Sequence, residues 1–168
     1  MAALPIVLWP DARLSTRCEA VDPNDPSVAQ LAQDMLDTMY AAPGRGLAAP
    51  QVGVLKRIFV MDIGWKEGPK APVVCLNPAI LWRSGSLSTG PEGCLSIPDV
   101  ITDVARATEI RLVWTELSGK AREEHLTGFA AICAQHEFDH LDGIVTFDRL
   151  APEARQVAEA VYADRTRT

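Results

Sequence analysis

The stretch GFAAICAQHEFDHLDG, residues 128–143, decides the fold of this chain. Its apolar residues recur at helical spacing, and an Asp-Gly pair closes the segment. His136 and His140 stand four positions apart, so on a helix both imidazoles project from one face and can reach the same metal ion. Glu137 lies about one residue's rotation from that axis, where a carboxylate can act as general base on a metal-bound water. Burying these groups in an apolar helix is costly without a metal or a dense hydrogen-bond network.

Two imidazoles require a third ligand, and three positions are candidates. A third histidine in the pattern HExxHxxGxxH is excluded, because Thr146 stands at its place. A glutamate about twenty residues downstream, which other HExxH peptidases use, would be Glu159. An upstream ligand would be Cys94, which sits between polar residues in a glycine-containing turn. We favour Cys94, because a thiolate with two imidazoles leaves one coordination position open for water.

Outside this helix, the sequence indicates a block of strands between helices. Asp25-Pro26 has the form of a helix start, and the helix that follows is expected to end near residue 42. The segment GRGLAAPQVG, residues 44–53, is too rich in glycine and proline for regular structure. We expect strands over 57–63, over 72–81 with an interruption at Asn77-Pro78, within 104–117, and after a turn at 118–120.

A last helix is expected after Pro152. Helix, strands and then helices predict an α+β fold, with mixed or antiparallel strands packed around the central HExxH helix. The chain would then have one helix near each end. Its 168 residues fit a single domain over 1–168.

Composition narrows the function classes. The chain has 16 Lys+Arg against 22 Asp+Glu, a net charge of −6 that gives no general attraction to DNA or an anionic membrane. No apolar run approaches the roughly 20 residues of a membrane helix. The first residues lack the basic region of a signal peptide, so we expect a cytoplasmic protein. The four cysteines form no CxxC pair, which favours reduced thiols, although two disulfides also fit an even count.

Three motifs occur in order along the chain, at residues 44–51 (GRGLAAPQ), 92–96 (EGCLS) and 135–140 (QHEFDH). Together they resemble the signature motifs of the peptide deformylase family. The resemblance extends from PDARL at 10–14, through Asn77-Pro78, to the terminal helix. It implies a monomeric, bacterial-type metallohydrolase that removes the N-formyl group from N-formylmethionyl nascent polypeptides and releases formate. It also implies Fe²⁺ as the cofactor, with Zn²⁺, Ni²⁺ or Co²⁺ as alternatives in purified protein.

Carried over residue by residue, the resemblance implies a role for each motif position. A metal-bound water would attack the formyl carbonyl, with Glu137 as general base and acid. The implied metal ligands are Cys94, His136 and His140; the groups that hold the formyl oxygen are the Gln51 side-chain amide and the Leu95 backbone N–H; and the substrate-binding positions are Arg45, Gly46, Glu92 and Gly93. This set fits the chemistry, because amide hydrolysis develops negative charge on the formyl oxygen and needs donors aimed at it.

Two departures from the family pattern affect the outer substrate groove. Arg45 stands between the two glycines of the first motif, where an apolar residue is common. Ile101 lies in the stretch after the cysteine motif, where relatives often carry a basic residue. We expect Cys133, one turn before His136, to belong to the core or to the pocket wall rather than to the ligand set.

The charge of the C-terminal helix is relevant to whether the protein binds ribosomes. In relatives a basic C-terminal helix docks on the ribosome. Here the arginines are nearly balanced by acids, which predicts weak ribosome association at most; the charged residues are Arg155, Arg165 and Arg167 against Glu153, Glu159 and Asp164.

Two other functions stay open at this point. One is an HExxH endopeptidase with Glu159 as ligand. The other is a non-enzymatic binding protein of the same fold, which would have little need for Glu137 and Gln51 together.

Overall fold

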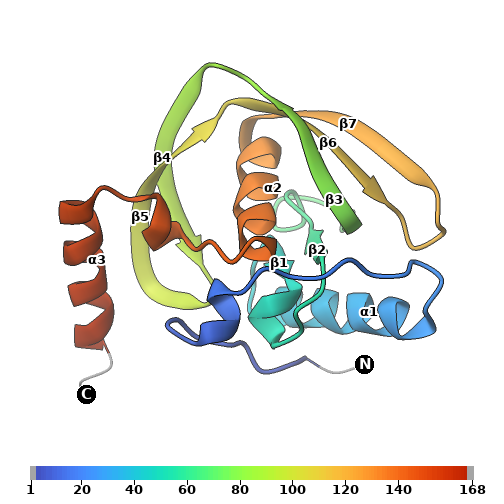
Figure 1. The fold of residues 1–168 in the computed structure, drawn as a ribbon, viewed down its shortest axis with the longest axis horizontal. Coiled ribbons are helices and arrows are strands. Elements are labelled where there is room, and N and C mark those ends of the chain that lie inside the picture. The colour runs from blue at the N-terminus through green and yellow to red at the C-terminus, as the bar shows by residue number, and fades with distance from the viewer. Residues whose placement is uncertain (1–2, 166–168) are drawn as a thin grey trace.

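The computed structural model describes residues 3–165. Helix α2 (Gly128–Leu141), which carries the HExxH segment, stands in the middle of the molecule (Figure 1). The other helices are α1 (Pro26–Ala41) and α3 (Pro152–Arg165), with short 3-10 turns η1 (Ala12–Ser15), η2 (Ala49–Val52) and η3 (Thr146–Arg149). The strands are β1 (Gly46–Ala48), β2 (Ile58–Met61), β3 (Val73–Arg83), β4 (Leu87–Cys94), β5 (Ile97–Ala107), β6 (Glu109–Thr115) and β7 (Ala121–Thr127).

The strands form two antiparallel sheets. One has the order β1-β2-β3-β6-β7, and the other is the two-stranded ribbon β4-β5. Both sheets contact α2, α1 packs on β1 and β2, and α3 packs on β5 (Figure 1). The predicted α+β fold, with strands around a central helix and a helix near each end, is confirmed. No helix within residues 3–165 is long and apolar enough to cross a membrane.

Local signals fix the ends of the helices. The Asp25 side chain accepts a hydrogen bond from the Ser27 backbone N–H at 2.9 Å and caps α1, as the sequence predicts. Beyond the end of α2, Gly143 has a φ of +75°, and a Cβ there would lie 2.8 Å from the carbonyl carbon of Ser15. Only glycine fits both constraints, so this position sets how closely the end of α2 approaches the N-terminal segment.

The glycine- and proline-rich segment 44–53 is more regular than expected. Gly46 to Ala48 form β1, paired with β2 from Met61 to Phe59, and residues 49–52 form η2. Tertiary pairing with β2 outweighs the weak local preference of these residues. Pro50 is tolerated because it lies in the first turn of η2, where a backbone N–H has no partner within the helix.

The expected interruption of the strand at Asn77-Pro78 is a bulge inside a continuous β3. Asn77 has a φ of +47°, and its side chain bonds the backbone N–H and carbonyl of Val21, both at 2.8 Å. The irregular residue therefore anchors the segment that precedes α1.

Strands β4 and β5 are the main departure from the sequence-based expectation. The strand expected within 104–117 is confirmed as β6, whereas residues 104–107 form the end of β5, which is separated from β6 at Thr108. Strand β4 contains two glycines and a proline, which indicate a loop when read locally. Proline is accepted there because a strand in a two-stranded ribbon has a free edge.

Candidate active site

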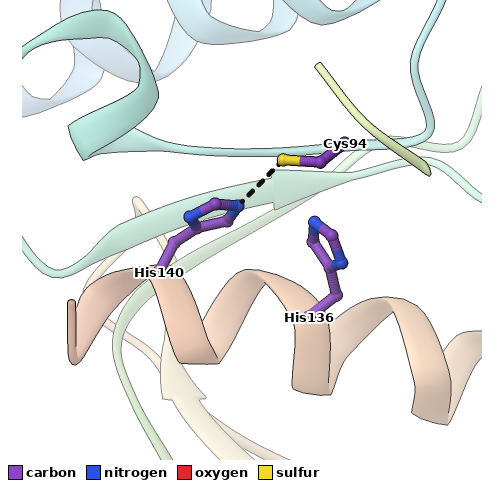
Figure 2. Close-up of side chains that lie close together, drawn as sticks. All are labelled: Cys94, His136 and His140. Atoms are coloured by element: carbon purple, nitrogen blue, oxygen red, sulfur yellow. Dashed lines mark hydrogen bonds between the residues drawn. The ribbon is translucent and has the colours of Figure 1, made fainter. Parts of the chain in front are cut away.

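Three potential metal ligands come together where β4 ends against α2. Figure 2 shows the side chains of His136 and His140, which project from the same side of α2 towards Cys94. One ligand atom from each residue lies within 4.8 Å of the other two, and Cys94 Sγ is 3.5 Å from His140 Nε2. No other group of this kind is found within residues 3–165. Glu159, the alternative ligand, lies in α3 and pairs with Arg155 at 2.6 Å.

The donor set fits a divalent transition metal. A thiolate and two imidazoles suit such an ion and leave a position open, as catalytic sites require. Two buried polar atoms here, Glu137 Oε1 and His140 Nδ1, have no hydrogen-bond partner among the described residues. Buried polar atoms are rarely left unpaired, so these atoms indicate a site that is completed by groups outside the chain.

A buried network of charges orients His136. The Nδ1 atom of this ring is 3.0 Å from Glu92 Oε1, which leaves Nε2 for a metal. Arg106 donates to both Glu92 oxygens at 2.9 Å and also to Asp139. Burial alone would raise the pKa of Glu92, but the hydrogen bonds from His136 and Arg106 outweigh it and lower that pKa. Glu92 is therefore a carboxylate that fixes the imidazole.

Asp139 links the same network to the C-terminal part of the chain. It accepts hydrogen bonds from Arg149 at 2.7 and 3.0 Å, in addition to its contact with Arg106. Its side chain is almost fully buried, so these arginines compensate a charge to which water has little access.

Gln51 places an amide donor beside the ligands. Its Oε1 accepts from the Ala48 backbone N–H at 2.9 Å, which identifies Nε2 as the atom that faces inwards. Nε2 lies 3.1 Å from Ser96 Oγ and 3.6 Å from Cys94 Sγ. Because an amide nitrogen has two N–H groups, Gln51 can donate to Ser96 and to a second acceptor at the same time.

The Glu137 side chain packs against β1 at Gly46, a position that requires glycine. A Cβ on Gly46 would lie 2.5 Å from Glu137 Oε2 and 3.0 Å from Cys133 Sγ. Burial raises the pKa of the Glu137 carboxyl to about 7. The missing side chain at Gly46 thus provides the space in which this carboxyl sits.

A cavity of about 520 Å³ opens over these groups. Every residue to which the sequence assigns a role lines this cavity, with the exception of His140. His140 is buried beneath the lining, and its Nε2 contacts Cys94 Sγ at 3.5 Å. Cys133 also lines the cavity, as expected of a pocket-wall residue. The Glu92 side chain, expected among the substrate-binding groups, faces His136 and Arg106 instead.

Arg106 and Arg149 are residues of the site that the sequence did not predict. A signal for Arg106 was present, since alternate residues of β5 face inwards and Arg106 falls in the row of Val104 and Thr102. Arginine in an otherwise inward-facing row indicates a buried charge partner. Arg149 has no comparable signal, because it lies in a short 3-10 turn.

Comparison with known proteins agrees with this geometry. Residues 3–156 match the family described as polypeptide deformylase. The chain belongs to the peptide deformylase family. A peptide deformylase of Alkalilimnicola ehrlichii is 47% identical over 156 residues, which cover 93% of this chain and 86% of that protein. Peptide deformylase 2 of Xanthomonas campestris is 44% identical, with coverage of 97% and 96%.

Solved peptide deformylase structures share the fold over nearly the whole chain. The Legionella pneumophila structure superposes with a TM-score of 0.91 at 38% identity, covering 98% of this chain and 96% of that one. The Ehrlichia chaffeensis structure in complex with actinonin gives 0.92 at 37% identity, covering all of both chains. Peptide deformylases are metallohydrolases that use a divalent metal, and Cys94, His136 and His140 are the candidate ligands here.

Proposed function

We propose that this chain hydrolyses the N-formyl group of N-formylmethionyl nascent polypeptides and releases formate. One observation carries the proposal: a cysteine sulfur and one nitrogen from each of two imidazoles lie within 4.8 Å of one another, beside a cavity whose wall contains Glu137 and Gln51. Membership of the peptide deformylase family supports the same reaction.

In this proposal each site residue has one task. A divalent metal held by Cys94, His136 and His140 would supply an electrophile for the formyl oxygen and would lower the pKa of its water. Glu137 takes a proton from the attacking water and returns it to the departing amine, which is otherwise a poor leaving group. Its position beside the ligands and its burial at 4% exposure support this role.

Donors on two segments would stabilise the charge that develops on the formyl oxygen. Gln51 Nε2 would offer the N–H that lies towards Cys94 Sγ at 3.6 Å, and the backbone N–H of Leu95 follows directly after the cysteine ligand. Such donors cost no reorganisation during the reaction when packing already holds them, and Gln51 is 1% exposed.

The peptide itself would bind along β1. This strand is an edge of the five-stranded sheet, so an extended peptide can add to it by backbone pairing. Gly46 allows close approach, and the methionine side chain would enter the apolar part of the cavity near Ile132, Cys133 and Leu95.

Formate release from formyl-Met-Ala-Ser tests the proposal. Chelation should abolish the activity, and a divalent metal should restore it. Cys94→Ser should lose the metal, whereas Glu159→Ala should keep both metal and activity because Glu159 pairs with Arg155 in α3. Metal loss in Glu159→Ala but not in Cys94→Ser would favour the endopeptidase instead. We also expect actinonin to inhibit this chain.

We propose Fe²⁺ as the native metal, with Zn²⁺, Ni²⁺ or Co²⁺ as substitutes in purified protein. The iron-loaded form should lose activity in air faster than the zinc-loaded form, because zinc has no redox chemistry. Mass spectrometry should find added oxygen on Cys94 first, since the other three thiols are buried and burial raises their pKa. Equal air stability of the two forms would contradict this assignment.

We further propose a single-domain, cytoplasmic monomer that associates only weakly with ribosomes. Within α3, Arg155 pairs with Asp148 and Glu159, and Arg165 pairs with Asp99, so few basic groups are left to bind phosphate. Arg167 lies outside the described residues. Co-sedimentation should show binding that disappears at physiological salt; sub-micromolar binding that depends on the tail would contradict the proposal.

A further inference from the structure

Arg45 lines the cavity with a partly exposed guanidinium. Its backbone belongs to the segment that leads into β1, and its side chain is 31% exposed. The guanidinium forms a salt bridge with Glu67 and lies 5.6 Å from the centroid of the Phe129 ring, at the start of α2. These two contacts fix the charge at the rim, so it is ordered before substrate arrives.

Lys66 adds a second positive charge to the same rim. It lines the cavity, and its Nζ lies 5.9 Å from the centroid of the Trp65 ring. Lys66 forms no salt bridge in the described part of the chain. The Arg45 side of the mouth therefore carries two cations and one acidic partner, Glu67, which is 64% exposed and does not line the cavity.

The cavity wall that β5 forms offers little charge to compensate. Asp99 lines it, but its carboxylate pairs with Arg165 of α3 at 3.3 Å. Ile101, on the same wall, is 67% exposed and uncharged. Glu92 lies deeper and is held by Arg106 and His136. The net charge of the lining is therefore positive at Arg45 and Lys66 and close to neutral along β5.

A bound peptide must pass this rim. With its formyl group at the ligands and its backbone along β1, an extended chain advances about 3.3 Å per residue. The residues that follow methionine then come within reach of Arg45 and Lys66. A carboxylate at that point can displace Glu67, whose exposed side chain returns to water at little cost.

We propose that Arg45, assisted by Lys66, makes this enzyme prefer substrates with Asp or Glu at the second or third residue. The inference rests on the proposed deformylase function and extends it to substrate choice. Arg45 and Glu67 would act as a competitive pair, in which the substrate carboxylate takes the place of the protein's own.

Peptides that differ in one charge provide the test. The kcat/KM for formate release is measured with formyl-Met-Ala-Ser as the neutral reference, and with Asp or Lys placed at residue two or three. We expect the Asp peptide to exceed its Lys counterpart by about two- to five-fold, the range of an exposed ion pair. The ratio should fall towards one in about 0.5 M salt, because screening weakens exposed pairs.

Three variants assign the effect to residues. Arg45→Gln should reduce the Asp-to-Lys ratio, and Glu67→Gln should increase it because the internal competitor is gone. Lys120→Gln removes a positive charge from the β6–β7 turn, away from the cavity lining, and should leave the ratio unchanged. A ratio of one in the parent protein, a preference for Lys, or no change in Arg45→Gln would overturn the inference.

Failure of the substrate preference can be distinguished from failure of the deformylase activity. Deformylation of the neutral peptide with an Asp-to-Lys ratio of one would refute only the substrate preference. If no peptide is deformylated, the proposed function fails. Calorimetric binding of Met-Ala-Asp and Met-Ala-Lys then decides whether the rim still selects acidic peptides.

Discussion

Glu137 is held in place by contacts that differ between its two oxygens. Oε2 faces Gly46, where any side chain would collide with it, whereas Oε1 is buried without a partner among the described residues. The carboxyl is thus packed against β1 and also lines the cavity in which a substrate would bind. The position of this carboxyl depends on α2, which carries Glu137, and equally on Gly46 of β1, which has no side chain to displace it.

Glu137→Gln should fold and bind metal but lose at least about 10²-fold in kcat, the lower end for general acid–base catalysis. Glutamine keeps the shape and burial but cannot accept the proton. Steady-state kinetics together with metal analysis check this expectation. Wild-type turnover in the metal-loaded variant would remove Glu137 from its assigned role.

Gly46→Ala should impair turnover without unfolding the protein. The new Cβ would approach Glu137 Oε2 to 2.5 Å, so the carboxyl must move away from the ligands. A displacement of this kind can reduce kcat by about 10²-fold. Gly64→Ala is the matched control, because a Cβ there meets nothing within 4 Å. If the two variants have equal kcat, the packing argument for Gly46 is wrong.

Among the elements, β5 and α2 are joined by charge as well as by apolar packing. Arg106 comes from β5, Glu92 from β4, and Asp139 from α2, so one buried guanidinium connects three segments. The His136 ring is attached to the same cluster through Glu92. The orientation of a metal ligand therefore depends on how the ribbon packs on the helix.

Arg106→Ala should lower the free energy of unfolding by about 3–5 kcal/mol, because it removes the buried guanidinium that Glu92 and Asp139 share and leaves only His136 and Arg149 to compensate them. Urea unfolding measures the change. Arg111→Ala on neighbouring β6 removes an exposed arginine and should cost less than about 0.5 kcal/mol. Should Arg106→Ala fail to fold, Arg149→Ala is the milder test, since it removes only the outer partner of Asp139.

A helix or strand could be predicted where residues close together in the sequence indicate it, and could not where it depends on pairing with a distant segment. The three helices follow from periodicity and capping residues, and His136 and His140 follow from their spacing on one of them. Strand β4 could not be recognised, because its glycines and proline are stabilised by pairing with β5. The Arg106 cluster pairs residues up to 44 positions apart, and no local pattern encodes such partners.

At the scale of the whole molecule, the buried thiols make the free energy of unfolding decrease as pH rises into the alkaline range. Burial raises the pKa of Cys18 to about 11, from an ordinary value of 9.0. Nearby Asp142 adds to this rise and Arg57 opposes it. Burial also raises the pKa of Cys75 and Cys133. The folded state therefore prefers the neutral thiols, whereas the unfolded chain ionises them at lower pH.

The stabilising effect of the neutral Cys18 thiol should be complete below pH 9 and lost as pH rises to about 11. The measurement is the free energy of urea unfolding for the parent protein and Cys18→Ala from pH 7 to 11. Other titrating groups cancel in the difference between the two proteins. That difference should shrink above pH 9; a constant difference would show that Cys18 does not titrate as its burial implies.

The two-stranded ribbon has a consequence for local unfolding of the protein. Strands β4 and β5 are not hydrogen-bonded to the larger sheet, and an isolated ribbon is only marginally stable in water. Yet β4 carries Cys94, so the ribbon cannot detach from α2 without dismantling the ligand set. Ribbon opening and metal release are then one local unfolding event. In amide hydrogen exchange, chelation should speed exchange in β4 and β5 while β3 and β6 keep their protection.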